Sequence, residues 1–361
     1  MRKRDTTLLR SSQLLAAVLL FNLFVFKTGA QNPSAGDAFP PQVAPAKTPP
    51  PAKQDPPKPD SNQQGAGDSQ AAQEQSGQDE GFIIHRRVDE VVLHATVVDD
   101  KQRMVMNLDK TAFNVFEDGK PQNITSFRRE DIPVAMGIVI DNSGSMREKR
   151  DKVNKAAINL VKSSNPQDEV FIVNFNDEYY LDQDFTNDLS KMREALEKVD
   201  TRGGTALYDA VVASSDHLKK NARLEKRVLF VVTDGEDNES QESLEQAIRR
   251  LQEENGPTVY TIGLLGDEKA RRARKALQFI SEKTGGIAFF PKTLDQVDEI
   301  SRQVAHDIRS QYTIGYKPTN PKSAGGYRAI KVEAKAKGYG KLTVRTKSGY
   351  YAGQERASSD K

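Results

Sequence analysis

The sequence of 361 residues contains no cysteine, which excludes disulfide bonds and thiol chemistry. Histidine is scarce: the four are His85, His94, His217 and His306, and none lies within five residues of another. This spacing excludes zinc sites of the usual histidine and cysteine patterns. An excess of charge is also missing, because 53 lysines and arginines against 51 aspartates and glutamates leave a formal net charge of +2. That balance argues against nucleic-acid binding, which normally needs a clear basic excess.

The first thirty residues have the pattern of a secretory signal. Positive residues at 2–4 and 10 precede a 13-residue apolar run at 14–26, and small residues follow at 28–30. The run is shorter than the roughly 20 residues that span a bilayer. We therefore expect residues 1–30 to be a cleaved signal peptide and the protein to be periplasmic or secreted, within the cell envelope. An uncleaved membrane anchor is the alternative, and we expect no other contact with a membrane.

Residues 31–80 have the composition of a linker. Ten of the 17 prolines fall between Pro33 and Pro59, and a stretch rich in glutamine, glycine and serine follows. Such a segment cannot bury enough apolar area to offset its chain entropy. We expect a disordered, extended tether, with a polyproline ligand for another domain as the alternative. Residues 353–361 are expected to be a disordered tail.

Residues 132–310 alternate between two kinds of apolar pattern. Four short runs are almost continuously apolar, which indicates strands buried on both faces; they lie at 134–140, 170–173, 228–232 and 259–265. Between and after them, apolar residues recur at helical spacing, as at 153–161, 207–218, 244–251 and 297–308. This alternation predicts an α/β domain with a doubly wound, mostly parallel sheet.

Short segments with β character flank this domain. The first, at 81–131, alternates from Val88 to Val97 and has extended stretches at 113–116 and 124–127. The second, at 311–352, has three more, at 312–316, 327–334 and 341–345. Each segment is too short to fold alone. We expect the two segments to pair as one small β module into which the α/β domain is inserted.

Polar residues stand where the predicted strands end. The first strand continues into the sequence DNSGS at 141–145, the strand at 228–232 continues into TDG, and RGGT at 202–205 precedes a helix. Because ligands bind at the carboxyl ends of the strands in open α/β sheets, we expect these loops to converge there. They would bring together two carboxylates and three hydroxyls, those of Asp141, Ser143, Ser145, Thr205 and Asp234. An all-oxygen set of this kind suits Mg²⁺, Mn²⁺ or Ca²⁺.

Simpler roles are open for several of these polar residues. Serine and threonine at the start of a helix are commonly N-caps, which would account for Ser145 or Thr205 singly. Glu236 and Asp237 are expected to form a solvated rim or cap rather than to be ligands. The basic residues between 269 and 275 are expected to form a solvated helix face, with an acidic partner or lipid headgroups as the alternative.

The three motifs together resemble the metal-ion-dependent adhesion site of von Willebrand factor type A (VWA) domains, over residues 133–308. The flanking stretches VVDDKQRMVMNLDKTAFNVFEDGKPQNI and QYTIGYKPTN resemble a bacterial subgroup of exported proteins with this domain. The resemblance implies that Ser143 and Ser145 bind the cation directly, and that Thr205 and the two aspartates bind it directly or through water. It also implies that the cation, preferably Mg²⁺, binds a glutamate or aspartate side chain of a partner protein.

The sequence therefore predicts an exported, cation-dependent adhesion or scaffold module rather than an enzyme. The three motifs contain no histidine, lysine or cysteine to act as base or nucleophile, and both aspartates would be committed to the metal. A metal-dependent hydrolase is one alternative. A VWA domain whose metal is purely structural is another.

Overall fold

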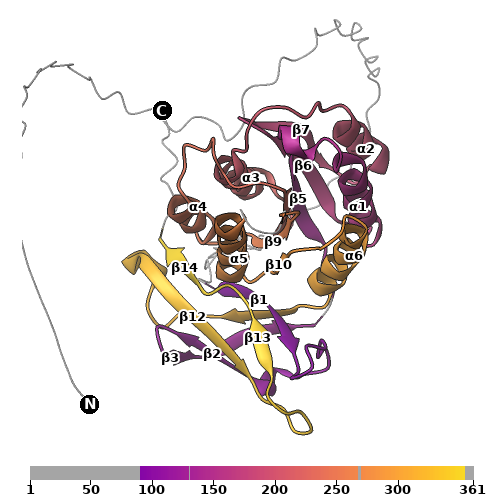
Figure 1. The fold of residues 1–361 in the computed structure, drawn as a ribbon. Helices are drawn as coiled ribbons and strands as arrows, with labels where there is room; N and C mark the ends of the chain where they lie inside the picture. The colour runs from indigo at the N-terminus through magenta and orange to yellow at the C-terminus, as the bar shows by residue number, and fades with distance from the viewer. Residues whose placement is uncertain (1–89, 130, 267–269, 354–361) are drawn as a thin grey trace, which may run out of the picture. The chain divides into compact units, whose positions relative to one another are not determined.

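The computed structural model describes residues 90–129, 131–266 and 270–353 (Figure 1). All of them belong to one unit of the chain, Asp37–Lys361. The predicted signal peptide, the predicted linker, the expected start of the first strand at Val88 and the predicted tail from residue 354 lie outside the described residues. In the part of the chain that is described, no helix is long and apolar enough to cross a membrane.

A six-stranded sheet forms the centre of the α/β domain, in the order β10-β9-β8-β5-β6-β7. Neighbouring strands run parallel, except that the edge strand β7 is antiparallel to β6. Helices cover both faces, so the predicted fold class is confirmed. The strands are β5 (Val134–Asp141), β6 (Glu169–Phe175), β7 (Tyr179–Thr186), β8 (Lys226–Thr233), β9 (Thr258–Gly263) and β10 (Ala288–Phe289).

In the described part of the chain, six helices form the two outer layers (Figure 1). One apolar core joins the sheet to α1 (Arg150–Lys162), α2 (Leu189–Glu197) and α6 (Gln296–Arg309). The other core joins the opposite face to α3 (Leu207–Asn221), α4 (Leu244–Leu251) and α5 (Arg271–Thr284).

The central strand β5 explains why these strands read as continuous apolar runs. Met136 and Ile138 enter the core with α1 and α6, whereas Ala135 and Val139 enter the core with α3 and α5. Alternate side chains thus face two different apolar layers, and neither set can be polar. Gly137 is required by space, because a Cβ atom there would lie 2.3 Å from the ring of Phe171.

Three elements of the α/β domain, β7, α2 and the two-residue β10, were not predicted from the sequence. The side chains of β7 are half-buried or exposed, as expected of an edge strand, so it lacks the apolar run that marks the inner strands. The helix α2 has nine residues and buries only Met192, Ala195 and Leu196. Neither β7 nor α2 therefore leaves a clear apolar pattern in the sequence.

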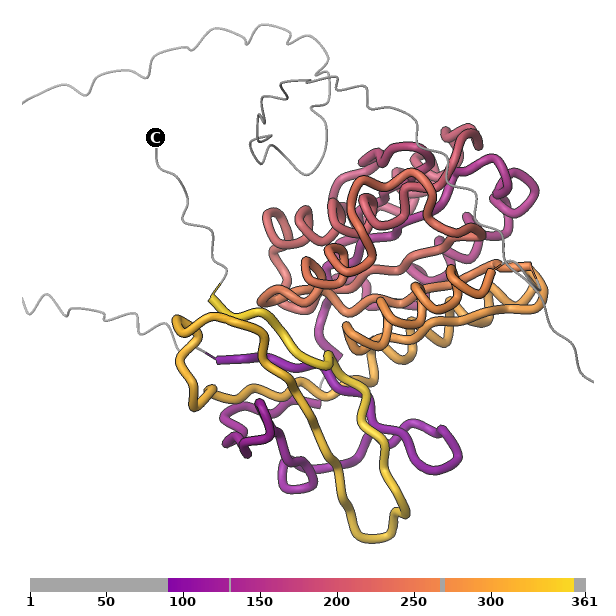
Figure 2. The backbone as a smooth tube through the Cα atoms, turned by 60° about the vertical axis from the view of Figure 1, so that its left-hand side comes forward, coloured from indigo at the N-terminus to yellow at the C-terminus, as the bar shows by residue number. Residues whose placement is uncertain are grey.

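Eight strands from both flanking segments form two further four-stranded sheets, which we call the β module. The sheet orders are β13-β1-β11-β4 and β14-β12-β2-β3. Strands from before and after the α/β domain lie side by side in Figure 2, and Leu93 faces Ile314 in the antiparallel pair β1–β11. The strands are β1 (Val91–Val98), β2 (Phe113–Glu117), β3 (Lys120–Gln122), β4 (Ile124–Arg128), β11 (Tyr312–Tyr316), β12 (Gly326–Ala334), β13 (Thr343–Arg345) and β14 (Gly349–Ala352).

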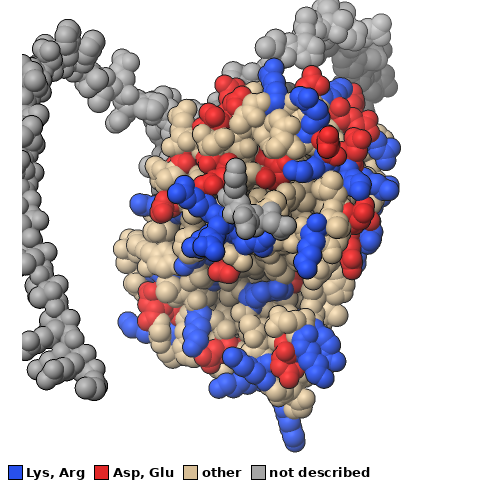
Figure 3. Space-filling model, viewed as in Figure 1, with Lys and Arg blue, Asp and Glu red and all other residues tan. Residues whose placement is uncertain are grey.

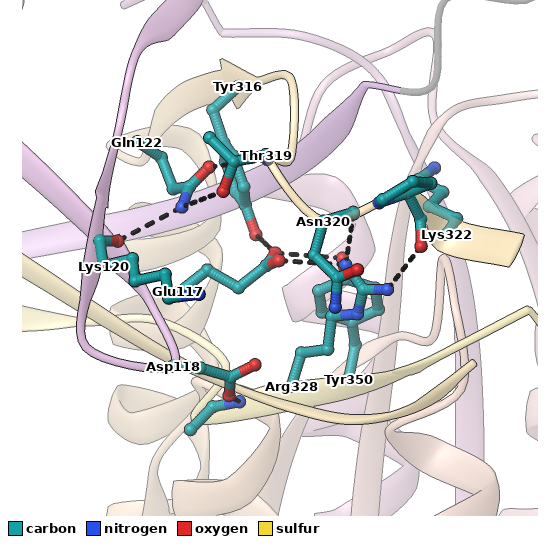
Figure 4. A network of polar contacts seen from close by, with 12 residues as sticks. Glu117, Asp118, Lys120, Gln122, Tyr316, Thr319, Asn320, Lys322, Arg328 and Tyr350 are labelled. Carbon is teal, nitrogen blue, oxygen red and sulfur yellow. Dashed lines mark hydrogen bonds and ion pairs between the residues drawn. The ribbon is translucent and has the colours of Figure 1, made fainter. Parts of the chain in front are cut away.

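A buried polar network centred on Glu117 lies inside the β module (Figure 4). The carboxylate of Glu117 accepts hydrogen bonds from the hydroxyls of Tyr316 (2.6 Å) and Tyr350 (3.0 Å). It also pairs with the guanidinium of Arg328 at 3.0 Å, and both charged side chains are at most 2% exposed. Burial, reinforced by the bonds to Glu117, raises the pKa of both tyrosines, which therefore stay protonated donors. The network joins strands that precede the α/β domain in the sequence to strands that follow it.

The end of α6 is tied to the β module by Asp307, which is almost fully buried. One oxygen of its carboxylate accepts a hydrogen bond of 2.6 Å from Tyr260 on β9. The other oxygen pairs with Arg345 on β13 at 2.7 Å. The last helix of the α/β domain therefore contacts the module through a charged hydrogen bond as well as through the chain itself.

Candidate metal centre

The predicted site begins with Asp141, the last residue of β5, which is 0% exposed. Its carboxylate accepts hydrogen bonds from the amide of Ser143 (2.7 Å) and from the hydroxyl of Thr233 (2.6 Å). Among the described residues, no basic group lies within ion-pair distance of it. Burial raises the pKa of Asp141; the bonds from Thr233 and Ser143 oppose that effect, and the charge of Asp234 adds to it. A buried carboxylate beside a second carboxylate is a site that a cation would stabilise.

Hydrogen bonds connect the rest of the first loop to the strand β8. The hydroxyls of Ser143 and Ser145 are 3.1 Å apart, and Ser145 donates a hydrogen bond of 2.7 Å to Asp234. Asp234 follows β8 directly, and its side chain is fully buried. Four of the five predicted ligands thus form one connected set at the carboxyl edge of the sheet.

Thr205 reaches the same place on a loop that contacts both of the others. The amide of Gly144 donates to the carbonyl of Gly203 at 3.2 Å, and the amide of Thr205 donates to Asn238 at 2.8 Å. The backbone of Gly203 has a φ of +71°, and a Cβ atom there would collide with the carboxylate of a neighbouring aspartate. A Cβ atom on Gly235 would lie 3.3 Å from the hydroxyl oxygen of Thr205. Glycine suits both positions: the positive φ of Gly203 disfavours other residues, and a side chain on Gly235 would crowd Thr205.

The helix-cap interpretation of Ser145 and Thr205 is wrong. The N-cap of α3 is Ala206 rather than Thr205, and it makes no side-chain bond to the helix. The hydroxyl of Ser145 donates to Asp234, away from the helix α1 that follows. Two amides at the start of α3 instead donate to the loop after β8: Tyr208 to Asp237 at 2.9 Å and Asp209 to Ser240 at 3.1 Å. Glu236 is exposed and lies 3.7 Å from Arg272 of α5.

Three neighbours of the site were missed by the sequence-based prediction. Thr233 orients Asp141, and its place directly before Asp234 in the TDG motif was the available signal. Lys149 forms an ion pair with the free oxygen of Asp234, so the site does contain a lysine although its motifs do not. Asn142 is buried, and both of its side-chain polar atoms lack a partner among the described residues.

The donor set has two carboxylates and three hydroxyls and therefore fits a hard divalent cation. Within the described residues, no group of three or more histidine, aspartate or glutamate side chains could hold a metal, so this site depends on hydroxyl oxygens. Arg150 lies close enough to Asp141 for their charges to interact. Burial lowers the pKa of Arg150 to about 10, an effect that the charge of Asp141 partly offsets.

Comparison with known protein families agrees with the resemblance to VWA domains that the sequence indicates. Residues 136–236 match the family model for the von Willebrand factor type A domain, which supports a VWA domain in this part of the chain. No curated protein matches the sequence.

Several solved structures are similar in fold. A von Willebrand factor type A protein from Catenulispora acidiphila is 12% identical, with 74% of each chain covered and a TM-score of 0.43. The vWF domain of the type V pili tip protein Mfa5 from Porphyromonas gingivalis is 13% identical, with 49% of this chain and 97% of that chain covered and a TM-score of 0.42. A point mutant of the PilB minor pilin from Streptococcus sanguinis is 13% identical and has a TM-score of 0.43. That match covers 50% of this chain and 62% of the pilin, which is less than two thirds of the pilin's length.

Proposed function

We propose that this protein is an exported binding module that holds a divalent cation and, through it, a carboxylate of a partner protein. The cation would be held by Asp141, Ser143, Ser145, Thr205 and Asp234. The observation that carries the proposal is the fully buried Asp141 carboxylate, which lies near the charge of Asp234, accepts hydrogen bonds from Thr233 and Ser143, and has no ion-pair partner among the described residues. Export rests on the signal-like pattern of residues 1–30.

The chemistry of the site favours binding over catalysis. Both carboxylates would be ligands, which leaves neither free to act as a general base. The ammonium of Lys149 is held by Asp234. Mg²⁺ is the preferred cation because the site is small and rich in hydroxyls, with Mn²⁺ or Ca²⁺ as alternatives. When bound, the cation supplies a positive charge that two carboxylates just balance and a coordination position for an outside carboxylate.

The surface beside the site also favours an acidic partner. Basic side chains gather over α5 in Figure 3, and four of them are exposed on its first turns: Arg271, Arg272, Arg274 and Lys275. Arg272 lies next to Glu236, two residues after the proposed ligand Asp234. A partner carboxylate that approaches the cation would therefore also approach a positively charged helix.

The proposal is tested by capturing partners from envelope and culture-supernatant extracts on the purified chain. Capture would be compared with Mg²⁺, with EDTA, and for Asp141→Ala in Mg²⁺. We expect a partner that only the metal-loaded wild type retains. Glu236→Gln removes an exposed charge from the same loop and should retain that partner. Retention in all three conditions would contradict cation bridging, and metal binding without any metal-dependent partner would favour a structural metal.

Lys149→Met is expected to tighten the binding of Mg²⁺ or Mn²⁺ by about tenfold, because the ammonium and the metal compete for Asp234. Titration with Mn²⁺, followed by electron paramagnetic resonance, measures the change. Lys152→Met is the matched control, since this lysine lies three residues further along, in the first turn of α1, but pairs with Asp295. Weaker metal binding by Lys149→Met would instead mean that Lys149 supports the loaded site.

Charge reversal on α5 tests the acidic partner. The double variant Arg271→Glu/Arg272→Glu is expected to slow association with the captured partner by about tenfold at low salt and less at high salt. Surface plasmon resonance at two ionic strengths gives the rates. The control makes the same change of charge on α2, with Lys191→Glu/Arg193→Glu, both exposed. An equal effect of both double variants would show only a response to net charge.

A further inference from the structure

A polar cavity lies where the β module meets the amino-terminal edge of the central sheet, which is opposite the edge that carries the proposed metal site. It has a volume of about 220 Å³. Its wall combines Val92 and His94 of β1, Arg227 at the start of β8, Thr258 at the start of β9, and Lys347 between β13 and β14. The cavity is therefore built from both parts of the fold and is separate from the proposed metal site, which lies at the carboxyl edge of the same strands.

Two cations on this wall lack carboxylate partners. Arg227 donates one hydrogen bond, of 3.2 Å, to the carbonyl of Asn255. Its Nε atom is buried and has no hydrogen-bond partner among the described residues. Lys347 makes no ion pair within the described part of the chain. A buried guanidinium N–H without an acceptor is costly, and an anion between the two side chains would satisfy it and also pair with the ammonium of Lys347.

The nearby carboxylates are already engaged with other cations. Glu225 lines the cavity, but its side chain is 78% exposed and lies 3.4 Å from Arg128. Glu254 forms an ion pair with Lys322. These two carboxylates therefore do not pair with Arg227 or Lys347, and the cavity wall keeps an excess of positive charge.

The titration of the surrounding groups agrees with an excess of positive charge. The pKa of His94 is lowered well below its usual value, first by burial and then by the charges of Lys226, Lys347 and Arg128. The pKa of Arg227 is lowered by burial alone. Burial lowers the pKa of Lys347 to about 8; Glu254 opposes this effect, and the nearby cations Lys322 and Arg227 add to it.

We propose that this cavity binds a small oxyanion, a phosphate or a carboxylate, between Arg227 of the α/β domain and Lys347 of the β module. Guanidinium and ammonium groups form strong charge-assisted hydrogen bonds to both kinds of oxyanion. Because the two cations come from different parts of the fold, the bound anion links the β module to the α/β domain. It thereby stabilises their interface.

The test is calorimetric titration of the full chain with inorganic phosphate, and separately with acetate, in buffers freed of metal by resin rather than by a chelator. We expect saturable one-to-one binding of phosphate, weakened about 10- to 100-fold in Lys347→Met and in Arg227→Met. Lys341→Met, an exposed lysine outside the cavity wall, should bind like the wild type. Competition between acetate and phosphate identifies a general oxyanion site, whereas binding of only one of them identifies the class that the cavity takes.

Two further variants test the proposal even if Lys347→Met or Arg227→Met fails to fold. Glu225→Gln leaves both cations in place and is expected to tighten phosphate binding. Asp141→Asn should leave phosphate binding unchanged, which separates this site from the proposed metal site. Binding of sulfate, whose charge is constant, should weaken as the pH rises past about 8, because Lys347 then loses its proton. No saturable binding by the wild type, or equal binding by Lys347→Met, overturns the proposal.

Discussion

Replacing Asp141 with asparagine is expected to lower the affinity for Mg²⁺ by more than the about 10- to 100-fold that loss of an outer-shell partner typically costs. Asp141 is one of only two carboxylates in the site and is fully buried, so no water-exposed acid can take its place. Metal-dependent stabilisation should disappear with it. At a Mg²⁺ concentration of 100 times the dissociation constant, the wild type should gain about 2.7 kcal/mol in its free energy of unfolding.

Calorimetric titration and thermal unfolding with and without Mg²⁺ measure these effects. Glu236→Gln, which removes an exposed carboxylate two residues from Asp234, should behave like the wild type in both. An equal loss of affinity in both variants would show that general negative charge, and not coordination, attracts the cation.

Without metal, Asp141→Asn should not destabilise the protein at neutral pH. Burial raises the pKa of Asp141 in the folded state, so its charge costs stability there. The folded protein then binds more protons than the unfolded chain, and this aspartate lowers stability as the pH rises from its unfolded pKa through its folded pKa. Asparagine removes that cost. A large loss of stability in the metal-free variant would contradict this account.

Replacing Arg328 with methionine is expected to destabilise the protein by about 3–5 kcal/mol. Among the described residues, the change leaves the buried carboxylate of Glu117 with two tyrosine hydroxyls to stabilise its charge. It also removes the donors that reach the carbonyls of Asn320 and Pro321. Glu117 lies on β2, before the α/β domain, and Arg328 lies on β12, after it. Loss of their ion pair should therefore open the β module first.

Denaturant unfolding measures the effect on stability, and hydrogen exchange locates it. Lys331→Met is the matched control, because this lysine is on the same strand, 72% exposed, and paired only with Glu333. Its effect should stay below about 1 kcal/mol. If the two variants were equally stable, the buried pair would contribute no more than a surface pair.

Local pattern was sufficient for the elements that are buried on both faces. Strands β5, β6, β8 and β9 were predicted because their alternate side chains face two apolar layers, which leaves an unmistakable run. The half-exposed β7 and the four-residue β14 carry no such run and were missed. The pairing of β1 with β11 joins residues more than 200 positions apart, and such pairing depends on the folded α/β domain between them.

The candidate site divides in the same way. Its five oxygen donors could be predicted because three short motifs each follow a strand or precede a helix. The ion pair between Lys149 and Asp234 could not be predicted, because it depends on where the turn before α1 places a long side chain. The polar network of Glu117 and the cavity between Arg227 and Lys347 combine residues that are distant in the sequence, so no local spacing indicates them.

The sequence by itself determined the class of fold and the chemical character of the oxygen-rich loops. Both follow from local periodicity and from residues that the chain places within a few positions of each other. Tertiary structure alone decided which strands pair in the β module, which lysine balances Asp234, and where two cations are left without carboxylate partners among the described residues. These outcomes depend on distances between segments far apart in the chain, and only packing sets those distances.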